Sequence, residues 1–354
     1  MSRSAIIAGI GLVVPGADAL EGLLLHCQRA AGGARTEIET IPLPSGVKSQ
    51  DARRMARLTR MALYAADSAW MRAGFSGRDG SVFVGLTHGS TSYFQEFHDY
   101  LFDYGPEMAG PNAFSNGVTN APLGTVSKHL GLTAGGCTLA GLENCGLEAL
   151  TYGIDTIARG ESALCCVGAA EEYSPLVESH YRELGWYPGA VPAHLPHPLS
   201  SGAAVQGVGV SEGSVFLALS APGLGDAARC RVTPVDNLGR LDLDVDLVIS
   251  GAGGGPQDVC EAEALRSVLG RAKRPPALLF TKPFFGETFA VGSLLSVAVA
   301  WDIVTNGTAY PLHPASDDLR ASVAATVDFA RVNSVLVLAA ARDGQVSAVT
   351  VSMH

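Results

Sequence analysis

Seven cysteines and nine histidines are the side chains of this chain with the clearest capacity for covalent or metal chemistry. The cysteine count is odd, Cys165 and Cys166 are adjacent in an apolar stretch, and no Cys-x-x-Cys pair occurs, so the pattern predicts no disulfide framework. The internal histidines show neither His-x-x-x-His nor mixed Cys/His ligand spacing. Those considered are His88, His98, His129, His180, His194, His197 and His313. We therefore expect no metal site.

The glycine-rich run Gly253-Gly-Gly-Pro is the segment that most suggests a phosphate-binding loop. It lacks the Lys and the Ser or Thr that a P-loop uses to hold phosphates and their metal ion. The run is more typical of a closely packed turn. We therefore expect the chain to work without a cofactor.

The composition of the 354 residues, 47% hydrophobic and only 16% charged, indicates extensive burial, because ordinary soluble domains carry roughly 25% charged residues. Such a chain is suited to a large sheet covered on both faces or to an extensive interface. The net charge of −10 gives no basic footprint for nucleic acid. No apolar run reaches the ~20 residues of a membrane span, and the start reads as a strand rather than a signal peptide. We expect a cytoplasmic protein.

Short apolar runs alternate with helical patterns along the chain, which predicts a sheet with helices on its faces. In the first half, strands are expected at residues 5–8, 81–86, 163–168, 203–210 and 214–220, and helices at 57–73, 117–130 and 144–159. In the second half, strands are expected at 247–250, 277–280, 334–340 and 346–351, and helices at 257–269 and 286–305. The turn-rich segment 221–226 separates them. We expect one compact, duplicated α/β unit with halves 1–222 and 223–354.

Several phrases, in order, resemble the β-ketoacyl synthases of the thiolase superfamily. They are Ser4-Ala-Ile-Ile-Ala-Gly-Ile-Gly, residues 51–63, Gly110-Pro-Asn-Ala-Phe-Ser-Asn-Gly-Val-Thr-Asn-Ala-Pro, Leu130-Gly-Leu, residues 157–172 and Thr281-Lys-Pro-Phe-Phe-Gly-Glu. Each phrase is weak alone, but together they cover nearly the whole chain. The resemblance implies a thiolase-like, duplicated five-layer α/β/α/β/α fold.

The resemblance also implies a catalytic Cys at a strand-to-helix turn and two His, which accept the acyl chain and support decarboxylation. Counting back from the end of the nucleophile helix places Glu143 at the Cys. Ala252 lies at the first His and Glu287 at the second, and residues 335–340 replace a glycine-rich oxyanion loop. No catalytic residue of the family is therefore intact.

Nearby side chains leave alternatives open. Cys145 and Cys137 could supply a thiol, although packing is the usual role of a free Cys. Glu143 could assist decarboxylation, or it could simply be a helix-start acid stabilised by the helix dipole at ~0.3–1 kcal/mol. Glu287 is expected to pair with Lys282 or a backbone amide. The alternative activities are a stand-alone malonyl-carrier-protein decarboxylase or acyltransferase using Glu143 or Cys145, and an acyl-binding protein with no partner.

A condensing-enzyme pattern without its Cys and His pair resembles the chain-length factors of this family. Those subunits commonly carry Gln at the Cys position, so Glu143 is a departure. The resemblance implies a heterodimer with an active ketosynthase that works on acyl carrier protein in a type II polyketide system, of the kind that makes polyenes or aryl polyenes. It implies no independent activity.

The resemblance further implies which residues meet the partner. The strand at 136–141, with Cys137 and Leu139, would pair with its counterpart across a pseudo-two-fold axis. The preceding segment would direct Phe114, Asn116, Val118 and Thr119 toward the partner's acyl tunnel. Plain core packing is the competing interpretation of Phe114.

Overall fold

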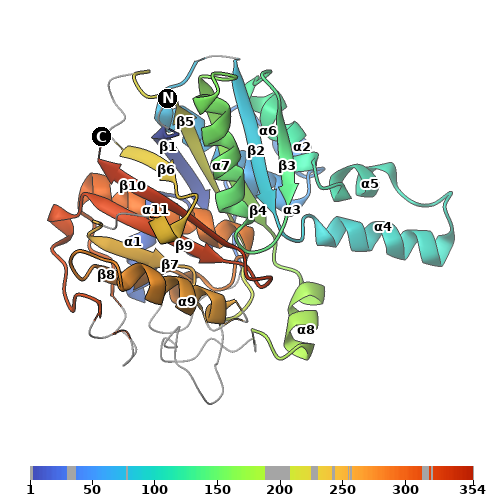
Figure 1. Cartoon of the computed structure of the whole chain (residues 1–354). Coiled ribbons are helices and arrows are strands. Elements are labelled where there is room, and N and C mark those ends of the chain that lie inside the picture. The colour runs from blue at the N-terminus through green and yellow to red at the C-terminus, as the bar shows by residue number, and fades with distance from the viewer. Residues whose placement is uncertain are drawn as a thin grey trace.

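The computed structural model describes residues 3–29, 37–76, 79–187, 208–224, 230–240, 244–253, 255, 257–312, 319 and 322–353 (Figure 1). Its strands are β1 (Ala5–Val13), β2 (Gly80–Leu86), β3 (Gly136–Ala140), β4 (Leu164–Glu171), β5 (Gly213–Ser220), β6 (Cys230–Pro234), β7 (Leu247–Ser250), β8 (Ala277–Phe280), β9 (Ser334–Ala340) and β10 (Val346–Met353). Its α-helices are α1 (Leu20–Arg29), α2 (Ser49–Ala52), α3 (Arg57–Ala73), α4 (Thr91–Tyr104), α5 (Pro111–Gly117), α6 (Ala121–Leu130), α7 (Cys145–Ala158), α8 (Pro175–Glu183), α9 (Asp258–Leu269), α10 (Lys282–Phe285) and α11 (Ala290–Asn306).

The strand order shows an internal duplication. The order along the hydrogen-bonded sheet is β3-β2-β4-β5-β1-β6-β10-β9-β7-β8. Its first five strands, read from the outer edge inward, follow the same order as the last five read from the other edge inward, with β1 matching β6 and β5 matching β10. The two sets join where Ala5, Ile6 and Ile7 pair with Val232, Arg231 and Cys230.

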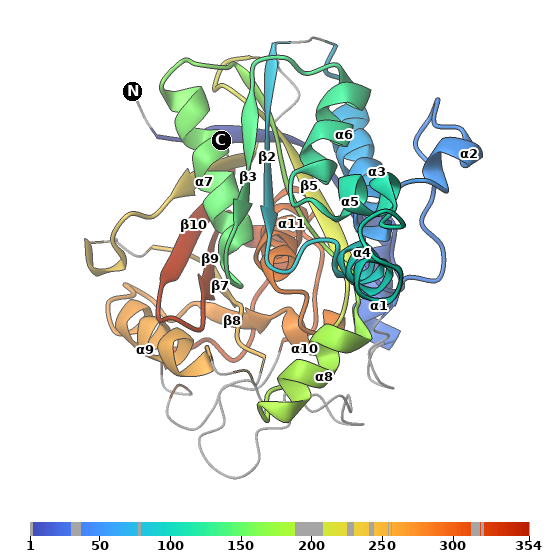
Figure 2. The same ribbon diagram turned by 90° about the vertical axis from the view of Figure 1, so that its right-hand side faces the viewer.

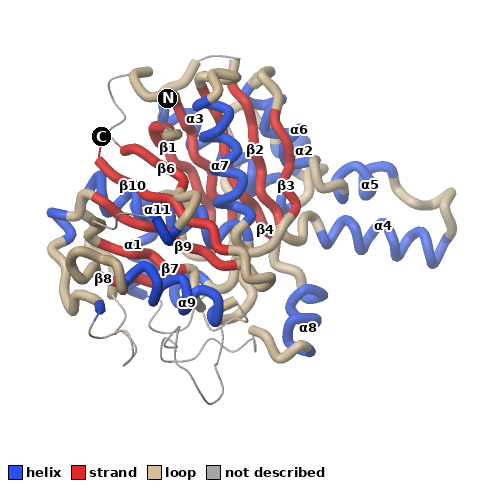
Figure 3. Tube along the Cα trace, viewed as in Figure 1, coloured by secondary structure: helices blue, strands red, loops and turns tan. Residues whose placement is uncertain are grey.

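Helices α7 and α11 lie between the two strand sets, because α11 contacts strands of both. Helix α11 is apolar all round and almost entirely buried, as a helix between two sheets must be. Helices α3 and α6 cover the outer face of the first set, and α9 covers that of the second. Figure 3 shows these helices on both faces of the twisted strands. The thiolase-like five-layer α/β fold is therefore confirmed.

Three expected elements differ from the structure. The expected helix 117–130 begins only at Ala121, as α6, because Val118 is extended and Pro122 lies in the first turn of the new helix. The expected helix 286–305 begins only at Ala290, after Phe289 with a positive φ of 50°. Residues 203–207 lie outside the described residues, and Val210 forms only an isolated bridge to Glu287 rather than a strand.

Helices α4 and α5 form an arm that the sequence patterns do not predict. The arm extends away from the body in Figure 1 and points toward the viewer in Figure 2. No residue of α4 is buried, and its exposed aromatic side chains include Phe94, Phe102 and Tyr104. Such a patch of aromatic surface is typical of a contact site for another molecule.

Among the described residues, no helix is long and apolar enough to cross a lipid bilayer.

Candidate functional site

Glu143 lies in the turn between β3 and α7 and is only 2% exposed. Its Oε1 atom is 2.8 Å from Nη2 of Arg342, and the backbone N–H of Arg342 donates to Oε2 at 3.2 Å. The Arg342 guanidinium stacks over the rings of Tyr181 and Trp186, at 5.1 and 5.5 Å from their centroids. The carboxylate is thus buried and paired with a cation.

Glu287 lies in the turn between α10 and α11 and is completely buried. The Lys282 ammonium donates to its Oε2 at 2.7 Å, and the Phe289 backbone N–H donates to its Oε1 at 2.7 Å. Both contacts expected for Glu287 are therefore present. Burial by itself lowers the pKa of Lys282, but the adjacent carboxylate outweighs it and the net pKa is raised. Lys282 therefore carries its positive charge at neutral pH.

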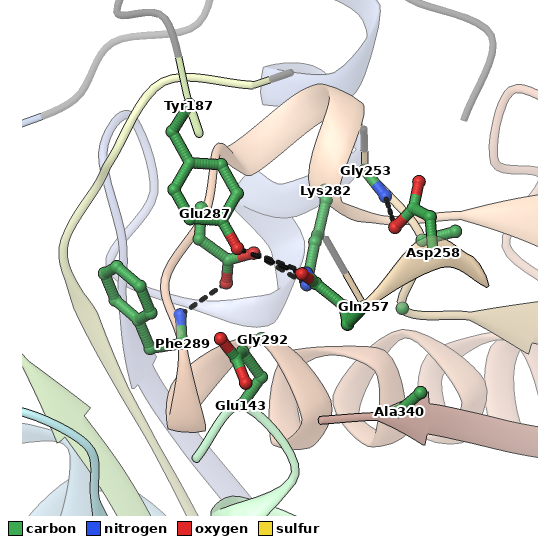
Figure 4. A network of polar contacts seen from close by, with 12 residues as sticks. Glu143, Tyr187, Gly253, Gln257, Asp258, Lys282, Glu287, Phe289, Gly292 and Ala340 are labelled. Atoms are coloured by element: carbon green, nitrogen blue, oxygen red, sulfur yellow. Dashed lines mark hydrogen bonds and ion pairs between the residues drawn. The ribbon is translucent and has the colours of Figure 1, made fainter. Parts of the chain in front are cut away.

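Two further side chains complete this second network. The Gln257 side-chain amide donates to Glu287 Oε2 at 3.1 Å, and the Tyr187 hydroxyl donates to Gln257 Oε1 at 3.1 Å. Figure 4 shows Glu143 and Glu287 approaching the same small region from different elements. The fold therefore brings together the two glutamates that the family resemblance places at catalytic positions, each with its own cation.

Ala252 does not join these networks. It is fully buried and packs in an apolar cluster with Val248 and Leu338. The polar group nearby is Glu261 of α9, whose carboxylate accepts hydrogen bonds from Ser250 Oγ at 2.9 Å, Gly251 N at 2.6 Å and Ala340 N at 2.6 Å. Glu261 ties the ends of β7 and β9 together. The sequence analysis did not identify Glu261. Its spacing of four residues from the apolar Leu265 places both side chains on the same, buried face of the helix, and this spacing was visible in the sequence.

The segment that the resemblance places at the oxyanion loop is a regular strand. Residues Val335–Ala340 belong to β9, which pairs with β7 and β10 and is almost entirely buried. The strand is paired on both sides, and the Ala340 N–H donates to Glu261, so this segment does not form an open loop of N–H groups around a reacting oxygen. Among the described residues, no group of His, Cys, Asp or Glu is arranged to hold a metal ion.

Cys145, the alternative nucleophile, is the first residue of α7 and is fully buried. Its Sγ donates to the Leu139 carbonyl at 3.3 Å, and burial raises the pKa of the thiol to about 12. A thiol with that pKa carries almost no thiolate at neutral pH, and the thiolate is the reactive form.

We predict that iodoacetamide will not alkylate Cys145 in the folded protein at pH 8. The control is Cys260, which is partly exposed, and should be alkylated under the same conditions. Peptide mass spectrometry measures both, and unfolding in urea should expose both thiols equally. Alkylation of folded Cys145 at the rate of Cys260 would revive the nucleophile interpretation.

The proposed tunnel residues separate into two groups. Phe114, Val118 and Thr119 line a pocket of about 410 Å³ at the base of the arm. Phe114 is 58% exposed, so the core-packing interpretation of this residue is wrong. Asn116 instead holds the arm to the body, because its side chain bonds the Ala56 backbone N–H at 3.1 Å and the Arg54 carbonyl at 3.0 Å.

Strand β3 lies at one end of the strand order and, in the part of the chain that the structure describes, pairs only with β2. Cys137 and Leu139 pack against the central core between the strand sets. What β3 presents at the sheet edge is therefore its backbone, rather than these two side chains.

Comparison with a protein-family model identifies the family of this chain. Residues 29–221, more than half of the chain, match the family model of the β-ketoacyl synthase N-terminal domain. A search of curated proteins finds no match.

Solved structures similar to this chain include the ishigamide ketosynthase/chain length factor, with a TM-score of 0.83, 16% identity and 100% of both chains covered. A β-ketoacyl synthase from Burkholderia phymatum STM815 has a TM-score of 0.80, 17% identity and 100% coverage of both chains. A type II PKS acyl-carrier protein in complex with its ketosynthase bound to the hexaketide has a TM-score of 0.76, 14% identity and 99% coverage of both chains. These likenesses concern the fold, and with the family match they show that the chain belongs to the β-ketoacyl synthase family.

Proposed function

We propose that this chain is a catalytically silent ketosynthase-like subunit, a chain-length factor, that forms a heterodimer with an active ketosynthase in type II polyketide biosynthesis. The observation that carries the proposal is the state of its three family catalytic positions. Glu143 and Glu287 are buried in ion pairs with Arg342 and Lys282, and Ala252 is packed in apolar surroundings. A subunit whose reaction centre is filled by its own side chains depends on a partner for the chemistry.

The surface of the chain supports a partner role. Strand β3 offers an open sheet edge, and an unpaired edge is a ready template for another strand. The arm beside it carries exposed aromatic residues and the pocket that Phe114 lines. We propose that β3 pairs with the equivalent strand of the ketosynthase and that the arm borders the acyl tunnel of that partner.

The similar solved structures also support a role in polyketide biosynthesis. One similar structure is a ketosynthase/chain length factor, and another holds an acyl-carrier protein with its ketosynthase. We propose that this subunit meets acyl carrier protein through the heterodimer, that the pathway makes a polyene or aryl polyene, and that the complex is cytoplasmic. We also propose halves 1–222 and 223–354 for its duplicated unit, a boundary consistent with the repeated strand order.

The experiment is co-expression with the ketosynthase encoded beside this chain, with an affinity tag on only one subunit. The expected result is co-purification in a one-to-one complex that extends acyl chains from malonyl carrier protein, whereas this chain alone neither decarboxylates it nor gains a covalent acyl group. A stable monomer or homodimer that never captures the ketosynthase would refute the proposal. Turnover by the chain alone, lost in Glu143→Ala, would favour the decarboxylase alternative.

A further inference from the structure

Glu172, the residue after β4, is a buried carboxylate that contacts the N-termini of two helices. It is 5% exposed. Its Oε1 atom accepts hydrogen bonds from the Ser92 N–H at 2.8 Å and from the Ser92 hydroxyl at 2.7 Å, in the first turn of α4. Its Oε2 atom accepts a hydrogen bond from the Leu58 N–H at 3.3 Å, in the first turn of α3. One carboxylate therefore joins the first helix of the arm to a helix of the body.

Neither of these two helices is capped by a side chain at its own N-cap position. Ala56 is the N-cap of α3 and Ser90 is the N-cap of α4, and neither side chain makes a capping hydrogen bond. The first N–H groups of a helix have no partner within the helix, and the helix dipole places partial positive charge there. A carboxylate satisfies both requirements. Glu172 therefore supplies from β4 the capping acceptor that α3 and α4 lack.

The neighbouring carboxylate, Glu171, holds the segment that leads from β2 into α4. Glu171 is 1% exposed and accepts hydrogen bonds from the Thr87 N–H and, at 3.2 Å, from the His88 N–H. The next residue, Gly89, has a φ of 73°, in the left-handed region that favours glycine. Glu171 and Glu172 therefore bind the chain on the two sides of the turn at Gly89, where the arm leaves the sheet.

The second helix of the arm is anchored at the same place. The Asn116 side chain of α5 bonds to Ala56 and Arg54, immediately before α3. Helix α4 has no buried residue, and its main contact among the described elements is with α5. The direction in which the arm leaves the body, visible in Figure 1, is therefore set at the N-terminus of α3 rather than by packing along α4.

We propose that Glu172 is a positioning residue that fixes the direction of the arm by capping α3 and α4 with one carboxylate. Helix α4 has 14 residues and is about 21 Å long, so a small rotation at its base becomes a large displacement at Tyr104. The consequence for the product rests on the proposed function, in which the arm borders the acyl tunnel of the ketosynthase. Glu172 then affects the length of the product without touching the acyl chain.

The first test measures amide hydrogen exchange in the full-length subunit alone. Glu172→Ala removes the acceptor of both helices and should speed exchange in the peptides that contain Leu58 and Ser92 by about two- to thirtyfold, the effect of losing an N-cap. Glu172→Gln keeps one side-chain oxygen, which the two donors of Ser92 should retain, so only the Leu58 peptide should exchange faster. This nearly isosteric variant keeps the proposal testable if the alanine variant does not fold.

The matched control changes Glu261 to Ala and to Gln. Glu261 is likewise a buried carboxylate that accepts backbone N–H hydrogen bonds, but its partners lie at the ends of β7 and β9. These variants should leave exchange at Leu58 and Ser92 as in the wild type. Unchanged exchange at both peptides in the Glu172 variants, or an equal increase in the Glu261 variants, overturns the capping role.

The second test combines each subunit with the ketosynthase and compares the lengths of the products by mass spectrometry. Glu172→Ala should broaden the length distribution while malonyl carrier protein is consumed at the wild-type rate, and Glu261→Ala should keep the wild-type distribution. A wild-type distribution from Glu172→Ala overturns the role in product length. Because exchange is measured without a ketosynthase, a subunit that shows the exchange effect but never captures that partner refutes the proposed function and leaves the capping role standing.

Discussion

Replacement of Glu287 by alanine is expected to lower the free energy of unfolding by about 3–5 kcal/mol, because it leaves the Lys282 ammonium buried without a counter-ion. Lys282 is 5% exposed and its Nζ lies 2.7 Å from the lost carboxylate. The same change also leaves two hydrogen-bond donors, the Gln257 amide and the Phe289 N–H, without their acceptor. Urea unfolding followed by circular dichroism measures the loss.

The matched control is the double variant Lys282→Met, Glu287→Leu, which removes both charges and keeps apolar volume. Replacing a complete buried ion pair by apolar residues is often nearly neutral, so the double variant should recover most of the lost stability. The Lys282 stem already packs closely against Gly253, and a Met side chain can retain that contact. A single-variant loss below about 1 kcal/mol would show that the pair is hydrated, contrary to its burial in the structure.

The second large expected effect is on heterodimer formation with the proposed ketosynthase partner. We expect Thr138→Pro to abolish or weaken heterodimer formation by at least tenfold, while the subunit remains folded. The Gly141 N–H donates to Leu86 O of β2, and alternate residues of a parallel strand face opposite sides. The backbone N–H of Thr138 therefore faces the open edge of the sheet. Proline removes that donor and is tolerated only at such edges.

Thr138→Val is the control, because it keeps the N–H and nearly the same volume. It should bind the ketosynthase as the wild type does, and both variants should have similar melting temperatures. Analytical ultracentrifugation of each variant mixed with the ketosynthase measures how much heterodimer forms. Normal assembly of Thr138→Pro would mean that β3 is not the paired edge and would move the interface to the arm or elsewhere.

The elements most accurately predicted from sequence were those with a clear hydrophobic period and a local end signal. Helix α3 spans Arg57–Ala73 as predicted, and it ends at Gly74 in the left-handed conformation that favours glycine. Strands β7, β8 and β9 also match their predicted bounds, because each is a short apolar run buried on both faces. Helix α4 was missed because none of its residues is buried, so its aromatic residues follow no core-facing pattern.

The candidate site was predictable only where its contacts are local. Glu287 and Lys282 are five residues apart, so their pairing could be anticipated from the sequence. Glu143 and Arg342 are 199 residues apart, and no single sequence pattern connects them. The expected replacement of catalytic residues comes from the family resemblance, but the Arg342 cation that pairs with Glu143 came only from the fold.

The position of β1 also determines how the chain can fold during synthesis. This strand is almost entirely buried, and it pairs with β5 on one side and β6 on the other. Its partners begin about 200 residues later, so at ~5–20 residues per second the ribosome needs roughly 10–40 s to deliver them. Throughout that time this apolar segment of nine residues lacks its pairing strands β5 and β6. This strand is completed only after strands made much later in synthesis, and until then it is an unpaired apolar segment of the kind that promotes aggregation.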